Sequence, residues 1–377
     1  MVRMAMRLAQ FVNRKVLVSQ KLKACVPFRE CLFHALTPPL DDSEVARLAK
    51  EFKTDIVSEC VRKLIASGNP NIDFYVLLVR SMGDIMACEP ITRYLKGIAP
   101  QCRIHWILFS RYRGAVETNP LIDEIIEVKS LSEGKDLCSR MAGCRGNVVV
   151  DCTYDATTCS VTNRTFPNRN NPSVNPNTYY SIGNLLETFC LTAGMPKLDE
   201  SPSYNIDGIL MPDVIPNRKY IVIHCHSSSK VRDWPECDWS RLARCLANNG
   251  YSVVEVGIEK GVRESFDGYV DYTGSRAISS IVKAIDGASL FIGGDSCFAH
   301  AANCRQTPSV ILLGKYFIYD NHFPYSGSFA RSDFFKIVRA PKGKFVKDIP
   351  FDQVRSSVDD MLKRVEHGVD VQRIKQF

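Results

Sequence analysis

The chain has 377 residues, of which 45% are hydrophobic and 24% are charged, values that suit a globular protein of two or three domains. This composition excludes disordered, collagen-like and fibrous classes, and no stretch reaches the ~20 apolar residues of a membrane-spanning helix. The net charge of +7 comes from the N-terminus: residues 1–29 hold seven of the 48 Lys and Arg and no acid, which leaves 41 basic against 41 acidic residues beyond them. A neutral body argues against nucleic acid as a partner.

The cysteine pattern indicates a reducing compartment. There are 15 cysteines, an odd number, and no CxxC pair that would favour a structural zinc site. No secretory signal with a cleavage pattern is visible. We therefore expect a cytoplasmic protein in which most of the thiols are small buried apolar groups.

Residues 1–70 are predicted to form a helical, basic N-terminal extension. Arg3, Arg7 and Arg14 fall on one helical stripe, which is typical either of a helix that binds a membrane surface or partner, or of an ordinary packed helix with a solvated basic face. A transit peptide is a third interpretation. A second helix is expected to start near residues 41–43 and to continue to Leu64.

Residues 71–210 are predicted to form a first α/β domain. Continuous apolar runs are typical of strands buried on both faces, and a helix is predicted at 91–95. The runs lie at 74–79, 104–109, 124–128 and 148–152. Strands that alternate with helices indicate a parallel, doubly wound sheet. Residues 160–178 hold six Asn and three Pro and are expected to form a long irregular loop.

A proline-containing stretch at 201–218 reads as a linker to a second α/β domain, residues 211–345. Its strands are predicted at 220–224, 252–256, 289–292 and 309–313, with a helix at 239–246. Residues 346–377 are predicted to be a C-terminal helical segment. Two α/β halves suggest a ligand cleft between them, at the carboxyl ends of the strands.

The first loop with candidate catalytic residues is Ser81-Met82-Gly83-Asp84, after the first predicted strand. Gly83 would allow a tight turn close to a ligand, and Asp84 would project into the cleft as a general base. The alternative is that Asp84 only caps the next helix.

Two further loops carry groups that bind anions. Ser229, Lys230 and Arg232 follow strand 220–224 and can donate to phosphate oxygens. His224 and His226 could be metal ligands, but no third ligand has suitable spacing, so no metal is predicted.

Gly293 and Gly294 precede Asp295 and Ser296 at the start of an Ala-rich helix that holds His300. Free backbone N–H groups and the helix dipole make this an anion site, or else Asp295 simply caps a tight turn.

These segments together resemble a known family. In order they read LLVRSMGDIMACEPITRYLK, NPLIDEIIEV, HCHSSSKVRDWPECDWSRLA and DYTGSRAISSIVKAIDGASLFIGGDSCFAHAANCRQTPSVILLG. This pattern resembles the ADP-heptose:lipopolysaccharide heptosyltransferases of glycosyltransferase family 9 over roughly residues 72–315. The resemblance implies a GT-B fold, in which two Rossmann-like domains face a cleft, with the nucleotide sugar mainly on the C-terminal domain.

The resemblance also implies roles for single residues. Family members invert the anomeric centre and need no metal or cofactor. Asp84 matches the family's base, next to an acceptor-side loop of Ser81, Met82 and Gly83. The donor diphosphate would lie on Arg232, Asp295, Ser296 and His300, and Glu259 would bind ribose; Ser229, Lys230 and Gly294 are added as phosphate-binding candidates because of their own chemistry. Cys297 replaces a family glycine and Arg232 replaces a lysine, which changes the donor geometry. The SSSK stretch that holds Ser229 and Lys230 also differs from the family's usual small-residue segment.

The main hypothesis is a transferase that moves a sugar, heptose in the family, from a nucleotide sugar to a lipid-linked, lipopolysaccharide-core-type acceptor. Residues 1–29 would then hold it peripherally on the anionic inner membrane. One alternative is transfer to a protein hydroxyl, for which the 160–178 loop leaves room. The other is a catalytically inert GT-B module that binds a nucleotide sugar.

Overall fold

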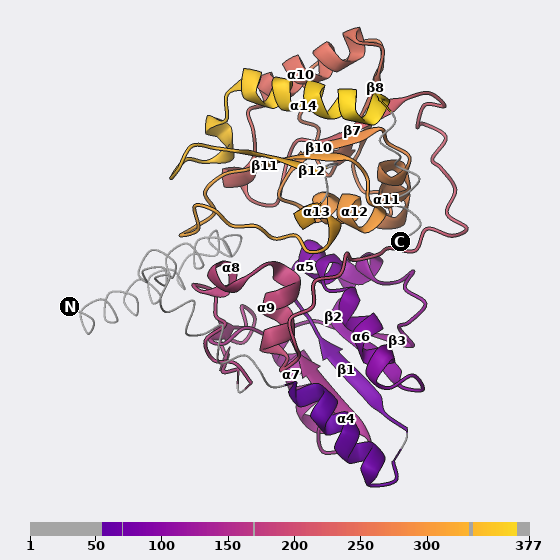
Figure 1. The fold of residues 1–377 in the computed structure, drawn as a ribbon, viewed down its shortest axis with the longest axis vertical. Coiled ribbons are helices and arrows are strands. Elements are labelled where there is room, and N and C mark those ends of the chain that lie inside the picture. Colours follow the sequence, from indigo (N-terminus) through magenta and orange to yellow (C-terminus); the bar gives the residue numbers. More distant parts are fainter. Residues whose placement is uncertain (1–54, 70, 169, 332–334, 368–377) are drawn as a thin grey trace, which may run out of the picture. The chain divides into compact units, whose positions relative to one another are not determined.

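The computed structural model describes residues 55–69, 71–168, 170–331 and 335–367, which form two parallel α/β sheets with flanking helices (Figure 1). The predicted helices within residues 1–54 lie outside the described part of the chain. The helix predicted to reach Leu64 is seen there as α4 (Ile56–Ala66), and Asp55 caps it by accepting a hydrogen bond from the Ser58 N–H at 3.0 Å.

The first sheet has the order β3-β2-β1-β4, and all of its strands are parallel. Its strands are β1 (Asp73–Leu77), β2 (Arg103–Phe109), β3 (Glu124–Val128) and β4 (Asn147–Asp151). Alternate side chains enter two cores: Phe74 and Val76 face the core under α5 (Met82–Ala87), α6 (Pro90–Ile98) and α9 (Leu185–Thr192), while Leu77 faces α7 (Leu131–Met141). The four predicted strands are confirmed within a few residues, because apolar runs buried on both faces are a strong signal.

The stretch predicted as one long irregular loop is more ordered than expected. Within it, β6 (Thr165–Phe166) pairs with β5 (Thr157–Thr158), which lies just before it, and the stretch leads into the short helix α8 (Tyr179–Ile182). Asn168 is buried, and its amide donates to the carbonyls of Thr153 and Thr192 at 2.8 and 3.0 Å. The Asn168 side chain therefore holds this segment in place, because its amide supplies the hydrogen bonds that backbone N–H groups would make in a regular element.

The second sheet has the order β12-β11-β10-β7-β8-β9 and is also fully parallel. Its strands are β7 (Tyr220–His224), β8 (Ser252–Gly257), β9 (Tyr269–Thr273), β10 (Leu290–Gly294), β11 (Ser309–Leu313) and β12 (Phe335–Arg339). The prediction missed the edge strands β9 and β12, whose sequences mix polar and apolar residues. This strand order reverses direction between β7 and β10, the point at which doubly wound sheets bind ligands.

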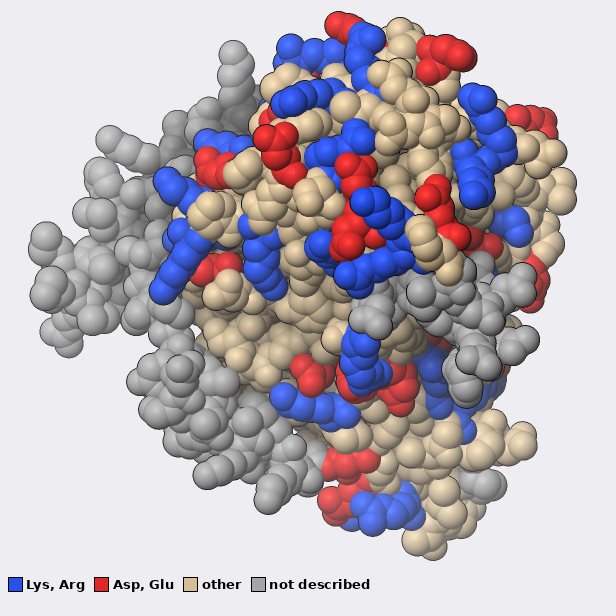
Figure 2. Space-filling view, turned by 45° about the horizontal axis from the view of Figure 1, so that its top comes forward, with Lys and Arg blue, Asp and Glu red and all other residues tan. Residues whose placement is uncertain are grey.

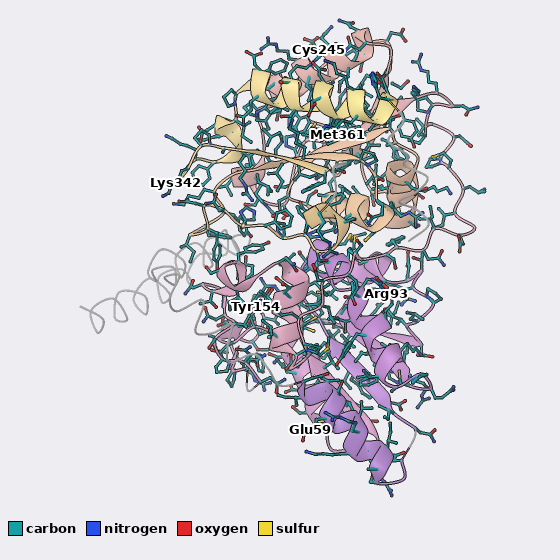
Figure 3. The ribbon with its side chains drawn as sticks, viewed as in Figure 1. Glu59, Arg93, Tyr154, Cys245, Lys342 and Met361 are labelled. Atoms are coloured by element: carbon teal, nitrogen blue, oxygen red, sulfur yellow. The ribbon has the colours of Figure 1, made fainter. Side chains whose placement is uncertain are left out.

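Helices cover both faces of the second sheet (Figure 1). On one face lie α10 (Glu236–Asn248) and α14 (Phe351–Glu366), and on the other lie α11 (Ile278–Asp286) and α12 (Cys297–Arg305). The predicted C-terminal helix is thus α14, and its buried Met361 points to this sheet (Figure 3). Short helical turns η2 (Ser110–Ala115), η3 (Lys230–Arg232), η4 (Val346–Asp348) and α13 (Ser328–Arg331) complete the described elements.

The described surface carries charges of both signs, as the near-neutral composition beyond residue 29 predicts. Over the face shown in Figure 2, Lys and Arg side chains are interspersed with Asp and Glu. In the described part of the chain, no helix combines the length and apolar character needed to span a bilayer. The 13 described cysteines are all free, and eight of them are buried.

The two halves meet where α5 packs on α12, and one hydrophobic core runs through both. Met82, Gly83 and Asp84 form the first turn of α5, so the prediction that they form a loop is wrong. Gly83 is buried against α12: a Cβ there would come within 2.9 Å of His300 Cδ2 and 3.3 Å of Cys297 Cα. Its lack of a side chain serves helix packing and not a tight turn.

This contact predicts that Gly83→Ala destabilises the protein. The added methyl group overpacks the α5–α12 contact, which typically costs about 1–3 kcal/mol and outweighs the gain in helix propensity. Gly97→Ala in α6 is the matched control, because a Cβ at this position would have no neighbouring atom within 4 Å, and the exchange should be neutral or stabilising by up to ~1 kcal/mol. Urea unfolding of both variants measures the difference, and equal stabilities would contradict the packing argument.

Candidate active site

Two loops of the second half come together where β7 and β10 lie side by side, at the point where the strand order changes side. Gly293 of β10 pairs with His224 of β7, so the segments that follow these strands leave the sheet side by side. As a result Arg232, in η3, meets Asp295, with Nη1 of the arginine 3.1 Å from Oδ2 of the aspartate. Two residues that were predicted from separate motifs thus form one ion pair.

This ion pair is buried and held on several sides. The Arg232 guanidinium also donates to Ser228 Oγ at 2.9 Å and lies over the ring of Tyr316, 5.1 Å from its centroid. Burial alone would raise the pKa of Asp295, but the guanidinium of Arg232, helped by His322, lowers it below its ordinary value. Both partners therefore stay charged, and a fixed cation lies at the carboxyl end of β7 and β10.

The glycine pair and the start of α12 do not form the tight turn capped by Asp295 that the sequence offered as an alternative. Gly293 and Gly294 belong to β10, and Ser296 is the N-cap of α12, where its Oγ accepts a hydrogen bond from the Ala299 N–H at 3.4 Å. The interpretation of Asp295 as the cap is therefore wrong. A Cβ on Gly294 would come within 2.9 Å of the Arg232 carbonyl oxygen, so this glycine lets η3 approach the strand.

His300 links this ion pair to the first half. It lies on α12, is 2% exposed, and its Nδ1 has no hydrogen-bond partner among the described residues. Burial lowers the pKa of His300, and the carboxylates of Asp295 and Asp84 oppose that shift. Gly83, the residue before Asp84, packs against this histidine, so α5 brings Asp84 to the same helix that begins just after Asp295.

Asp84 supports the start of α5 but is not its N-cap, so the alternative that Asp84 caps this helix is wrong. It is the third residue of α5, and its Oδ2 accepts hydrogen bonds from the N–H and the hydroxyl of Ser81, at 2.9 and 2.6 Å. Ser81 is the N-cap, so Asp84 supports the helix start without being the cap itself. Arg80 Nε lies 3.9 Å from the same oxygen, while Oδ1 makes no hydrogen bond to any described residue and can accept a proton.

Several site residues were not predicted from the sequence. The segment 314–327, between β11 and α13, adds Tyr316 and His322, and α8 of the first half adds Tyr180. His322 Nε2 lies 3.6 Å from Asp295 Oδ2, and the Tyr180 ring lies 5.1 Å from the His322 ring. The density of aromatic residues in KYFIYDNHFPY was the signal that could have found them.

Further aromatic rings of the first half pack against the helix that carries Tyr180. Tyr154 stacks on Phe189 at 4.7 Å and on Tyr179 at 5.1 Å, and the Arg80 guanidinium lies 4.8 Å from its ring (Figure 3). Because Tyr179 precedes Tyr180 in α8, this stack fixes the helix that carries Tyr180 to the core of the first half.

Other predicted residues are not part of this cluster. Lys230 and Glu259 are exposed, and the Ser229 N–H donates to Ser227 Oγ at 3.2 Å. Buried Glu255 fixes the loop that carries Glu259, because its carboxylate accepts from the N–H groups of Gly261 and Val262.

The two histidines considered as metal ligands have separate partners. His224 bonds the Val256 carbonyl, and burial lowers its pKa to about 4, whereas His226 faces Asp233. No group of three or more His, Cys, Asp and Glu side chains suited to a metal ion occurs in the described ranges.

Comparison with known proteins gives consistent results. Residues 194–316 match the family model described as "Glycosyltransferase family 9 (heptosyltransferase)". A search with the sequence among curated proteins finds no match.

Solved structures share the fold. A family 9 glycosyl transferase from Veillonella parvula is similar at TM-score 0.55 and 15% identity, covering 78% of this chain and 97% of that one. E. coli heptosyltransferase WaaC with ADP-2-deoxy-2-fluoro heptose gives 0.55 and 15%, covering 77% and 99%, and E. coli ADP-heptose lps heptosyltransferase II gives 0.55 and 16%, covering 78% and 99%. At these identities the similarity shows the fold, which is GT-B.

The buried ion pair predicts an unequal response to two substitutions. Asp295→Asn leaves the Arg232 charge buried without its partner, which typically costs about 3–5 kcal/mol. Asp136→Asn is the control: its pair with Arg164 spans 3.1 Å, but the side chains are 51% and 52% exposed, and such pairs contribute about 0–1 kcal/mol. Denaturant unfolding measures both, and similar losses would mean that the buried pair contributes no more than a surface one.

Proposed function

We propose that this chain is a glycosyltransferase of family 9 that inverts the anomeric centre without a metal and moves heptose from ADP-heptose to a lipopolysaccharide-core-type acceptor. The observation that carries this proposal is the position of Asp84. This carboxylate belongs to the first half, and Gly83, the residue before it, packs on His300 of α12, the helix that starts just after Asp295 of the Arg232–Asp295 pair. We infer that Asp84 as base and this pair as anion site serve one reaction centre.

The base acts on the acceptor. In an inverting transfer, an acceptor hydroxyl attacks the anomeric carbon as the bond from that carbon to the diphosphate oxygen breaks. The hydroxyl proton passes to Asp84, whose Oδ1 is available while Ser81 holds Oδ2. General-base catalysis of this kind typically contributes ~10²–10⁴-fold.

The second half stabilises the leaving group. Negative charge grows on the nucleoside diphosphate as the bond breaks, and preformed donors reduce the barrier because they need no reorganisation. Arg232 supplies a buried cation, the start of α12 at Ser296 supplies backbone N–H groups, and Lys230 adds an exposed ammonium. Gly294 keeps the arginine turn close to this helix start.

The donor identity rests on the relatives and on one loop. The family is described as heptosyltransferases, and two similar structures, WaaC and TibC of E. coli, hold ADP-heptose compounds. Glu259 is exposed at the end of β8, in the loop that Glu255 fixes, and there it can accept hydrogen bonds from ribose hydroxyls.

Asp84→Asn tests the proposed base. We expect the transfer rate to fall by about 10²–10⁴-fold, because an amide cannot take the proton, while the affinity for ADP-heptose stays unchanged. The rate is measured by release of ADP, and the affinity by titration calorimetry. Asp136→Asn, on the exposed face of α7, serves as the control with wild-type turnover. An unchanged rate in Asp84→Asn would eliminate Asp84 as the base.

The basic N-terminus suggests attachment to a cytoplasmic membrane surface, where a lipid-linked acceptor lies. Each Lys or Arg near an anionic surface contributes about 1 kcal/mol, and residues 1–29 hold seven with no acid. Deletion of residues 1–29 should abolish co-sedimentation with phosphatidylglycerol vesicles and preserve ADP binding. Wild-type sedimentation by the truncated chain would show that the membrane contact lies elsewhere.

A further inference from the structure

His322 lies beside the proposed donor site in a segment that none of the predicted motifs includes. It is 2% exposed, and its Nε2 lies 3.6 Å from Asp295 Oδ2. Its ring packs between aromatic side chains of both halves, 5.1 Å from Tyr180 and 5.5 Å from Tyr316. A polar ring is thus fixed next to the Arg232–Asp295 pair, where it has little freedom to turn away.

The nitrogens around Asp295 lack partners. Within the described chain, both ring nitrogens of His322, Nε of Arg232 and Nδ1 of His300 are buried and make no hydrogen bond. An unpaired buried polar group typically costs about 1–3 kcal/mol, and native proteins keep few of them. Since His322 Nε2 faces Asp295, three unpaired atoms remain near this carboxylate, His322 Nδ1, Arg232 Nε and His300 Nδ1, and they indicate a missing ligand with several acceptor oxygens.

We propose that His322 is a donor-contacting residue: it hydrogen-bonds the diphosphate of the nucleotide sugar, with Asp295 holding its ring in position. This inference rests on the proposed function and assigns a contact within the same site. The two ring nitrogens of His322 would both gain partners from an aspartate on one side and a diphosphate on the other. The negative charge that grows on the leaving group would then meet His322 as well as Arg232.

Tyr180, from the first half, packs on His322 and so helps to position it for the proposed contact with the diphosphate. Its ring covers His322 and also approaches Tyr316 and Tyr319, at 6.3 and 5.4 Å. Burial raises the pKa of Tyr180 well above its ordinary value, and Asp295 and Asp84 add to that shift, so its hydroxyl stays protonated. Tyr180 therefore brings no negative charge next to His322, where the diphosphate would lie.

The test compares His322→Gln with the wild type, using inorganic pyrophosphate and adenosine as probes in the full-length chain. We expect the Kd for pyrophosphate to rise ten- to hundredfold in the variant, because a charge-assisted hydrogen bond is lost, while the Kd for adenosine stays within twofold. A merely structural role would weaken both probes together. His367→Gln, an exposed histidine at the end of α14, is the control and should bind both probes normally.

Two results would overturn the proposal: equal pyrophosphate affinity in His322→Gln and the wild type, or a parallel loss of both probes. If the variant does not fold, nitrogen NMR of histidine-labelled wild type replaces it. Addition of pyrophosphate should then shift the His322 ring signals, and unchanged signals in a pyrophosphate-saturated sample would refute the contact. Turnover of ADP-heptose by the wild type tests the proposed function separately, since pyrophosphate binding does not depend on the base or the sugar.

Discussion

The buried ion pair between Arg232 and Asp295 is the constraint on which the site depends. Removing two charges from water is unfavourable, so such a pair persists only where geometry and further hydrogen bonds compensate. Here Ser228 and Tyr316 complete the surroundings of the guanidinium, and Gly294 leaves room for the turn that carries it. The protein thus keeps a positive charge in place before any ligand arrives, which is what electrostatic stabilisation of a leaving diphosphate requires.

The contact between the halves brings the proposed base, Asp84, to the helix that starts after Asp295. α5 packs on α12 through Gly83, and the residue after this glycine is Asp84. The same helix contact that buries apolar surface therefore sets where the carboxylate lies, so the stability of the protein and the geometry of the proposed site are coupled at this point. Ser81 further restricts the carboxylate by binding one of its oxygens.

Neighbouring groups in the site differ in charge. Burial keeps His300 neutral, whereas Asp295 keeps Arg232 charged. Aromatic rings from α8 and from segment 314–327 pack around these groups, and reduced contact with water strengthens electrostatic interactions. His322 lies inside this enclosure, with its unpaired nitrogens beside the cation.

The sequence by itself determined the two α/β halves, their central strands and the motifs that hold Asp84, Arg232, Asp295, Ser296 and His300, because apolar runs and glycine-bearing strand ends are local signals. Only the tertiary structure decided that Arg232 pairs with Asp295, that Gly83 lies in a helix, and that Asn168 orders its loop. These features depend on atoms far apart in the chain. Edge strands β9 and β12 were missed for a related reason, since one exposed side tolerates polar residues and weakens the local pattern. His322 gains its significance solely from the neighbours that folding supplies.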